Sequence, residues 1–171
     1  MKRTLLAMLA TLACVAAATA QNPVAVSVAI PENTPLSYPA RQVILKKMQQ
    51  LTTLNGVGTL AKDARFWLTP HVSIVSSDLT PTAPPRQLVK LSIVLMVADT
   101  AGSKSILAQT ELTAKGVGES EEAVILSALQ QIDIRSATLK RFMEQAKKKI
   151  AELPPVASQP PVAADTVTGE K

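Results

Sequence analysis

The sequence predicts an α+β fold of two layers, in which helices cover one face of a four-stranded, mostly antiparallel sheet. Two observations predict it. Apolar and polar residues alternate in four segments, which is the period of a strand with one buried face, and apolar residues recur at helical spacing in three others. The expected order is β-α-β-β-β-α-α. One helix after the first strand and two after the last can cover one face and leave the other partly in water.

The first strand is expected between Val24 and Ile30, where every second residue is a valine or an isoleucine, and Pro31 ends it. The first helix is expected from Ala40 onward. Its apolar stripe comprises Ala40, Ile44, Met48 and Leu51. We expect this helix to end near Gly56, because glycine suits the left-handed conformation that closes many helices.

Three further strands are expected in series. In each of them every second residue is mostly apolar, so these residues share one face of the strand. Strand by strand, these residues are Phe66, Leu68, Val72 and Ile74; Val89, Leu91, Ile93, Leu95 and Val97; and Ile106, Ala108, Thr110, Leu112 and Ala114. Pro70 predicts an edge or a bulge, because proline has no N–H for a sheet ladder. A proline-rich link over residues 78–86 and a short link over 99–103, where Gly102 is expected to supply a positive φ, predict an antiparallel meander.

Two helices are expected after Gly116-Val117-Gly118. Ser120 is placed to cap the first of them, and the acidic residues that follow suit the positive end of a helix. Its expected inner stripe is Ala123, Ile125 or Leu126, Leu129 and Ile132. A break over residues 133–136 separates it from the last helix, whose expected inner face carries Leu139, Phe142, Met143, Ala146, Ile150 and Leu153.

The first twenty residues match a cleavable secretory signal peptide, with Lys2 and Arg3 before an apolar core and small residues before Gln21. We therefore expect a signal peptide over residues 1–20, a single α/β domain over 21–153 and a proline-rich disordered tail over 154–171. The alternative to cleavage after Ala20 is acylation of Cys14, since the residues before it partly match a lipobox. The protein is expected to be periplasmic or secreted, or lipid-anchored if Cys14 is acylated.

Composition excludes several classes of chemistry from the mature chain. Cleavage after Ala20 would remove the single cysteine, and with it any disulfide, cysteine nucleophile or thiolate metal site. Loss of two basic residues lowers the formal charge from +5 to +3, a modest value that does not indicate nucleic-acid binding. Aromatic residues for base stacking are almost absent as well. We expect no cofactor and no nucleic-acid partner.

The outer face of the predicted sheet is the candidate contact surface. Most residues of that parity are polar, which is ordinary for an exposed face. Trp67, Val94 and Met96 share the same parity, and this is more apolar character than solvent exposure alone requires. A protein partner or a second copy of the chain is expected to cover part of this face.

Catalysis is the alternative hypothesis. His71, the only histidine, lies two residues from Ser73 on the same predicted face, and Asp78 follows further along, so the alternative function is a small hydrolase that uses His71 with Ser73. However, no G-x-S-x-G nucleophile elbow occurs, and we expect the protein not to be an enzyme. Gly116-Val117-Gly118 lacks the lysine of a phosphate-binding loop, so we interpret it as strand-to-helix geometry.

The last predicted helix carries a basic surface that includes Lys140, Arg141, Lys147 and Lys148. Cations near the end of a helix are expected from its dipole, which is the structural interpretation. The functional alternative is contact with anionic lipid headgroups or an acidic partner, which would make this a peripheral membrane protein. Membrane contact of that kind is not a transmembrane span.

The element order, together with a Gly-x-Gly turn that leads into an alanine-bearing helix over residues 115–128, resembles a family of small envelope modules. These include the curli-secretion lipoprotein, the penicillin-binding-protein activator lipoproteins and the amino-terminal domain of the Tol-system translocation protein. The resemblance covers residues 24–153. Residues 78–85 and 115–118 are also similar to small uncharacterised exported proteins of Gram-negative gut bacteria.

The first resemblance implies an accessory or assembly role in the periplasm through protein contacts, without cofactor or catalysis. This sequence departs from it in the imperfect lipobox and in having no evident pore-forming strand pair, so a secretion channel is not expected. The leading hypothesis is an exported, non-catalytic binding or assembly module of the cell envelope that acts through its sheet face.

Overall fold

The computed structural model describes residues 24–154. The predicted signal peptide with Cys14 lies outside the described residues, as does the predicted tail beyond Pro154. The described elements follow the predicted order, so the fold class is confirmed. They are β1 (Val26–Val28), α1 (Tyr38–Leu54), β2 (Phe66–Leu79), β3 (Gln87–Asp99), β4 (Ile106–Gly118), α2 (Glu121–Gln130) and α3 (Ala137–Ala151).

The four strands form one sheet in the order β1-β2-β3-β4. β1 is parallel to β2, and β2, β3 and β4 form the predicted antiparallel meander. β1 is shorter than predicted and pairs with β2 only as far as Leu68. Pro70 therefore lies where β2 has no neighbour on that side, and its missing N–H interrupts no ladder. The bulge in β2 lies further on, between Ile74 and Ser76.

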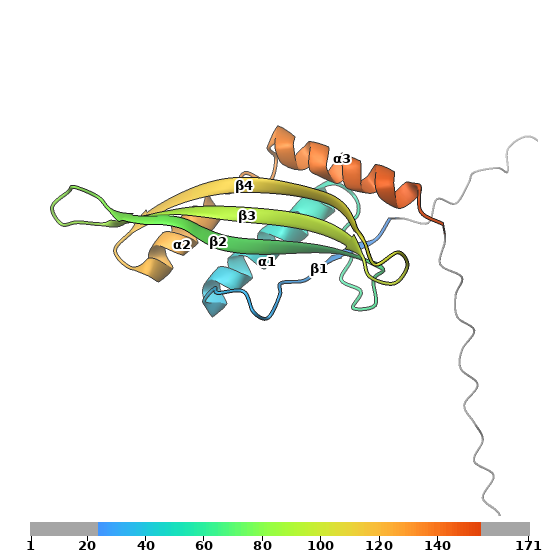
Figure 1. Ribbon diagram of the computed structural model, residues 1–171, viewed down its shortest axis with the longest axis horizontal. Helices are drawn as coiled ribbons and strands as arrows, with labels where there is room; N and C mark the ends of the chain where they lie inside the picture. The colour runs from blue at the N-terminus through green and yellow to red at the C-terminus, as the bar shows by residue number, and fades with distance from the viewer. Residues whose placement is uncertain (1–23, 155–171) are drawn as a thin grey trace, which may run out of the picture.

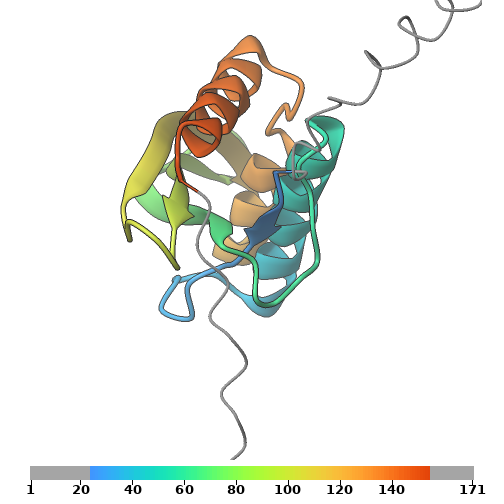
Figure 2. The same cartoon turned by 90° about the vertical axis from the view of Figure 1, so that its right-hand side faces the viewer.

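The sheet and the helices form two layers. Figure 1 looks onto the strands, with α1 and α2 behind them, and Figure 2 shows the same two helices on one side of the sheet. α3 lies next to β4. The apolar parity of each strand faces the helices and forms the core, except that Ile74 and Ile106, which the pattern placed there, are 46% and 57% exposed beside the irregularities in the strand register. The largest fully buried side chains of the core are Ile44, Met48, Leu51, Leu68, Leu91, Ile93, Leu95, Leu129, Leu139 and Met143.

The glycines of the Gly116-Val117-Gly118 turn allow α2 to approach β4 closely, as the structural interpretation predicts. A Cβ on Gly116 would lie 2.8 Å from the backbone nitrogen of Ala128 and against the carbonyl oxygen of Val124. This contact also corrects the predicted stripe of α2. Val124 and not Ala123 is buried, because Val124 packs over the two glycines.

Helix termini follow the sequence signals. The hydroxyl of Ser120 accepts a hydrogen bond from the backbone N–H of Ala123 at 3.3 Å, as expected of an N-cap. At the other end of α2, Lys47 Nζ on α1 donates to the carbonyl oxygens of Gln130 and Ile132, each at 2.7 Å. Burial lowers the pKa of Lys47, and the carboxylate of Asp133 raises it. The α1–α2 contact is therefore fixed by a cation at a helix C-terminus.

One predicted turn conformation is confirmed and one is wrong. Gly56 has φ of 69° after α1, as predicted. In the β3–β4 turn the residue with positive φ is Lys104, at 50°, and not Gly102. Gly102 instead provides space, because a Cβ there would lie 2.6 Å from side-chain atoms of both Arg65 and Asp99.

Candidate functional site

The three predicted contact residues lie on the uncovered face of the sheet. Trp67 is the register partner of Ala98, and Thr69 is the partner of Met96. Because Met96 and Ala98 are two residues apart on β3, Trp67 and Met96 are diagonal neighbours on the same face. Val94 precedes Met96 by two residues on β3 and therefore points to the same face. The structure thus places all three side chains in one continuous row.

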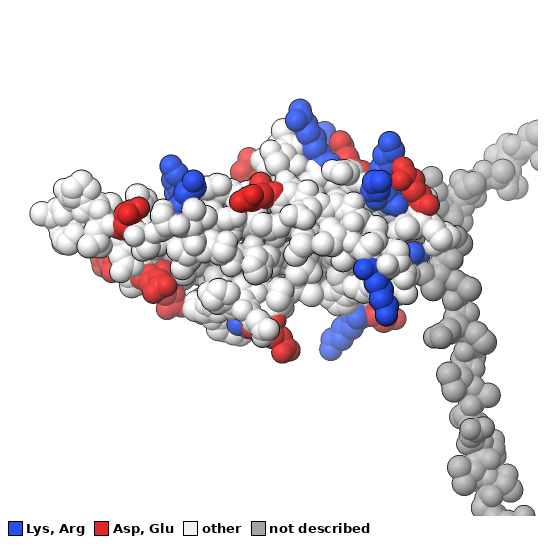
Figure 3. Space-filling view, viewed as in Figure 1, with Lys and Arg blue, Asp and Glu red and all other residues white. Residues whose placement is uncertain are grey.

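These side chains are half-buried, although no described helix covers them. Figure 3, which looks onto this face, shows a broad uncharged area across the strands, with acidic and basic groups mainly toward its margins. Flat surfaces of this kind, with apolar residues inside a polar rim, have the anatomy of a protein–protein contact. The face thus combines an uncharged centre, which contains half-buried apolar side chains, with a charged margin.

Polar residues follow the apolar row toward the β2–β3 hairpin. Glu111 is the register partner of Val94, and its Oε1 accepts a hydrogen bond of 2.6 Å from the hydroxyl of Ser92. One step further, Lys90 on β3 stands directly opposite Lys115 on β4. The described ion pairs are Arg65–Asp99 and Lys149–Glu152, so neither of these facing lysines has an acidic partner within residues 24–154.

The residues of the alternative hydrolase hypothesis are not assembled into a triad. His71 and Ser73 are exposed on the same face of β2. Asp78 lies seven residues beyond His71 on the same strand, which at a rise of about 3.3 Å per residue is roughly 20 Å away. Ser92, on the adjacent strand, is held by Glu111 and not by the histidine. Within residues 24–154, no hydrogen bond joins His71 to Ser73, Ser92 or an acidic side chain, so the predicted residues do not form a hydrogen-bonded triad.

The predicted basic surface lies on the outer side of α3. Lys140, Arg141 and Lys148 are exposed, and Lys147 is half-buried. Helical spacing puts all four on one arc of the helix. Glu144 lies within the same arc, so the positive charge there is partly offset. Lys149 lies elsewhere on the helix and pairs with Glu152 at 3.9 Å.

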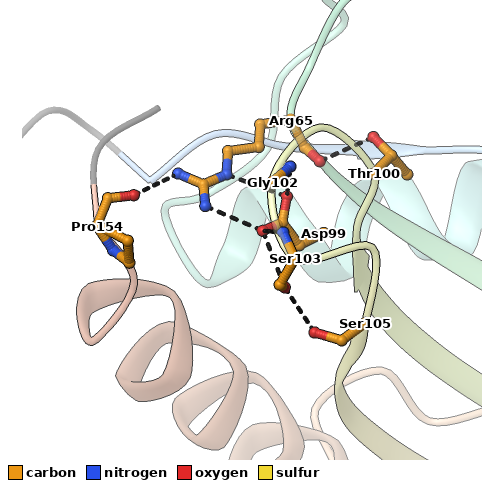
Figure 4. A network of polar contacts seen from close by, with 7 residues as sticks. All are labelled: Arg65, Asp99, Thr100, Gly102, Ser103, Ser105 and Pro154. Atoms are coloured by element: carbon orange, nitrogen blue, oxygen red, sulfur yellow. Dashed lines mark hydrogen bonds and ion pairs between the residues drawn. The ribbon is translucent and has the colours of Figure 1, made fainter. Parts of the chain in front are cut away.

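A polar network around the buried Asp99, which was not predicted from the sequence, closes the opposite end of the sheet (Figure 4). Arg65 Nε lies 3.0 Å from Asp99 Oδ1, and Nη2 lies 2.9 Å from Oδ2. The same carboxylate accepts backbone hydrogen bonds from Gly102 and Ser103, both at 2.9 Å. Arg65 Nη1 donates to the carbonyl oxygen of Pro154 at 2.9 Å.

This network has a structural role. The hydrogen bonds from Arg65 hold the pKa of Asp99 well below its usual range, assisted by the bonds from Gly102 and Ser103 and opposed by burial. Arg65 also lies over the ring of Phe66, with 4.9 Å from Cζ to the ring centroid. The polar groups of the network bond to one another and leave none for a ligand. The network therefore links the start of β2, the β3–β4 turn and the end of α3.

Within residues 24–154, no group of three or more histidine, cysteine or acidic side chains is arranged to hold a metal ion. None of the helices there combines the length and the apolar character that crossing a membrane requires.

A groove of about 550 Å³ runs beside the outer edge of β4. It lies between that strand and the connection from α2 to α3. The sequence did not predict it, because it depends on how α3 docks against the sheet. Its lining residues are Leu112, Thr113, Ala114, Lys115, Gln131, Ile132, Asp133, Ser136 and Thr138.

No family model and no curated protein matches the sequence. Among solved structures, a minor lipoprotein from Acinetobacter baumannii is 16% identical over 70% of this chain and 95% of its own, with a TM-score of 0.43. A lipoprotein from Neisseria meningitidis is 9% identical over 75% and 99%, with a TM-score of 0.41. A PelC dodecamer from Paraburkholderia phytofirmans is 11% identical over 71% and 87%, with a TM-score of 0.40. These names differ from the families that the sequence resembles.

Proposed function

We propose that this protein is an exported, non-catalytic binding or assembly module of the bacterial cell envelope that acts through protein contacts on its sheet face. The observation that carries the proposal is the row formed by Trp67, Met96 and Val94 on the uncovered face of the sheet. Tryptophan and methionine are enriched at the centres of protein interfaces. Burying this row against a partner would stabilise a complex by removing apolar surface from water.

The partner is a protein or a second copy of the chain. The uncovered face extends over three strands, and its apolar row contains the indole ring of Trp67, a side chain enriched among the residues that contribute most to interface affinity. Nucleic acid is disfavoured because basic groups do not dominate the face.

The export part of the proposal rests on the sequence. The predicted signal peptide supports a periplasmic or secreted protein that begins at Gln21, followed by one domain to residue 153 and a proline-rich tail over 154–171. Acylation of Cys14 would instead anchor the same domain to a membrane by its N-terminus.

A pull-down from envelope extract tests the sheet-face proposal. The purified mature chain is expected to capture a defined protein or to self-associate, and Met96→Lys is expected to abolish that binding, because it places a charge in the centre of the apolar row. Gln50→Lys, on the exposed side of α1, adds the same charge away from the sheet and should bind as the wild type does. A strictly monomeric protein that captures nothing would contradict the proposal.

The basic arc of α3 supports a second, weaker candidate function, contact with an anionic surface. Lys140, Arg141, Lys147 and Lys148 lie together there. Binding to vesicles that contain anionic lipid should then fall with added salt and be lost in K140E/K148E. Equal binding by the variant would remove this candidate.

A further inference from the structure

β4 is one of the two edge strands of the sheet, because β3 is its only partner among the named strands. An edge strand presents unpaired backbone N–H and C=O groups on its outer side. These groups are the template on which another extended chain can pair. The use of this edge therefore depends on what covers it.

α3 covers only part of the edge. The start of α3, at Ser136 and Thr138, lines the groove beside residues 112–115 of β4. The other end of α3 reaches the β3–β4 turn, where Arg65 binds Pro154. α3 therefore runs beside the first half of β4. Figure 1 shows that α3 ends before the half that continues toward the β2–β3 hairpin, where α2 packs behind the strand on the core face. The groove begins where this cover ends.

The two sides of the groove differ in chemistry. On the helix side it is lined by Leu112, Ala114 and Ile132, of which Ala114 and Ile132 are buried. On the open side it is lined by Thr113 and Lys115, which are exposed. Successive side chains of an added strand would point to these two sides in turn. An occupant with alternating apolar and acidic residues would match both sides at once.

The two facing lysines are a second, independent reason to expect an acidic occupant of the groove. Lys90 and Lys115 are register partners on adjacent strands. Like charges directly opposite each other destabilise a sheet. The one acidic residue that lines the groove, Asp133, lies in the α2–α3 connection, where its Oδ1 accepts a hydrogen bond of 2.9 Å from the backbone N–H of Arg135. A carboxylate beside Lys115 would offset the repulsion between the two lysines.

We propose that the uncovered edge of β4 binds an extended acidic peptide by strand addition, with Lys115 and Lys90 holding its carboxylates and the groove holding its apolar side chains. The main-chain hydrogen bonds would supply affinity, and the two differing sides would supply specificity, as in other cases of strand addition. This site is on the edge of the sheet and does not depend on the sheet-face contact.

The test uses the purified mature chain and a short capped peptide in which valine alternates with glutamate. Fluorescence anisotropy measures affinity, and backbone NMR shifts locate the contact. We expect shifts at residues 112–115 and 131–138. Lys115→Glu should weaken binding about tenfold or more, because it leaves two like charges in contact. Lys46→Glu makes the same charge change on the exposed side of α1 and should leave the affinity unchanged.

Two control peptides test the mode of binding. Replacing the central valine by proline removes a main-chain donor and should weaken binding about tenfold if the peptide adds as a strand. Replacing every glutamate by lysine should abolish binding. Equal binding of the proline peptide, no binding of the glutamate peptide, or shifts centred on Trp67 and Met96 would each overturn the proposal. So would a wild-type dimer that Lys115→Glu makes monomeric, because a second copy would then occupy the edge.

Discussion

The guanidinium of Arg65 holds both carboxylate oxygens of Asp99, although the two residues are 34 positions apart in the sequence. The Asp99 side chain is fully buried and that of Arg65 is 20% exposed. Breaking a buried pair on one side leaves an uncompensated charge. The pair therefore couples three distant segments of the fold.

Arg65→Ala is expected to lower the free energy of unfolding by about 3 kcal/mol, because it leaves the buried Asp99 carboxylate without its cationic partner. Chemical denaturation followed by circular dichroism measures the change. Lys149→Ala is the matched control. It breaks an exposed pair with Glu152 at 3.9 Å and should cost about 0.5 kcal/mol or less. Similar losses in the two variants would contradict a special role for the buried pair.

The same pair predicts a dependence of stability on pH. The pKa of Asp99 is lower in the folded chain than in the unfolded chain, so the ionised form stabilises the fold above the unfolded pKa of about 4. That contribution is lost progressively as the pH falls below about 4, toward the folded pKa. Asp99→Asn removes the titrating group.

Denaturation curves between about pH 7 and about pH 3 test this prediction. The wild type should lose more stability over that range than Asp99→Asn, which is less stable at neutral pH. Parallel pH profiles for the two proteins would show that Asp99 contributes nothing to acid sensitivity.

The glycine that lies under α2 should tolerate substitution less well than the glycine with positive φ. Gly116→Ala would drive a Cβ into the backbone of α2, at Val124 and Ala128, and is expected to cost about 2 kcal/mol or more. Gly56→Ala meets nothing within 4 Å and should cost about 1 kcal/mol, for its φ of 69° alone. Thermal unfolding ranks the two, and the reverse order would be evidence against close strand–helix contact.

The N-terminus of the mature protein decides between free and anchored forms. Intact mass spectrometry of protein purified from the envelope is expected to find Gln21 as the first residue. Retention of Cys14 with attached acyl chains would replace that prediction by membrane anchoring. Retention of residues 1–20 without modification would contradict export by either route.

The strands and most of their faces could be predicted from the sequence, because alternation with a period of two assigns each side chain of a strand to one of two faces. The alternation that placed Trp67 and Met96 on one face needed no knowledge of tertiary contacts. The bulge between Ile74 and Ser76 could not be predicted. An unpaired residue does not change the composition of the strand, and it alters only which residues of the two strands are paired. Beyond that bulge, Ser76 and not Ser77 shares a face with Lys90.

The long-range polar network was missed for a different reason. Asp99 resembles an ordinary turn residue in the sequence, and Arg65 is one of several cations in the chain. A usable signal did exist. Antiparallel pairing of the two strands makes Phe66 the partner of Asp99, which brings the preceding Arg65 next to the carboxylate. The groove beside β4 had no comparable signal, since the docking of α3 is set by packing at many contacts.

Photocrosslinking in living cells tests the sheet-face proposal most directly. A photoreactive amino acid in place of Met96 should give a defined crosslinked product, either with one envelope protein or with a second copy. The same amino acid in place of Gln50, on the exposed side of α1, should give none. Identical products at both positions, or no product at Met96 in a protein that is folded and exported, would contradict binding through the sheet face.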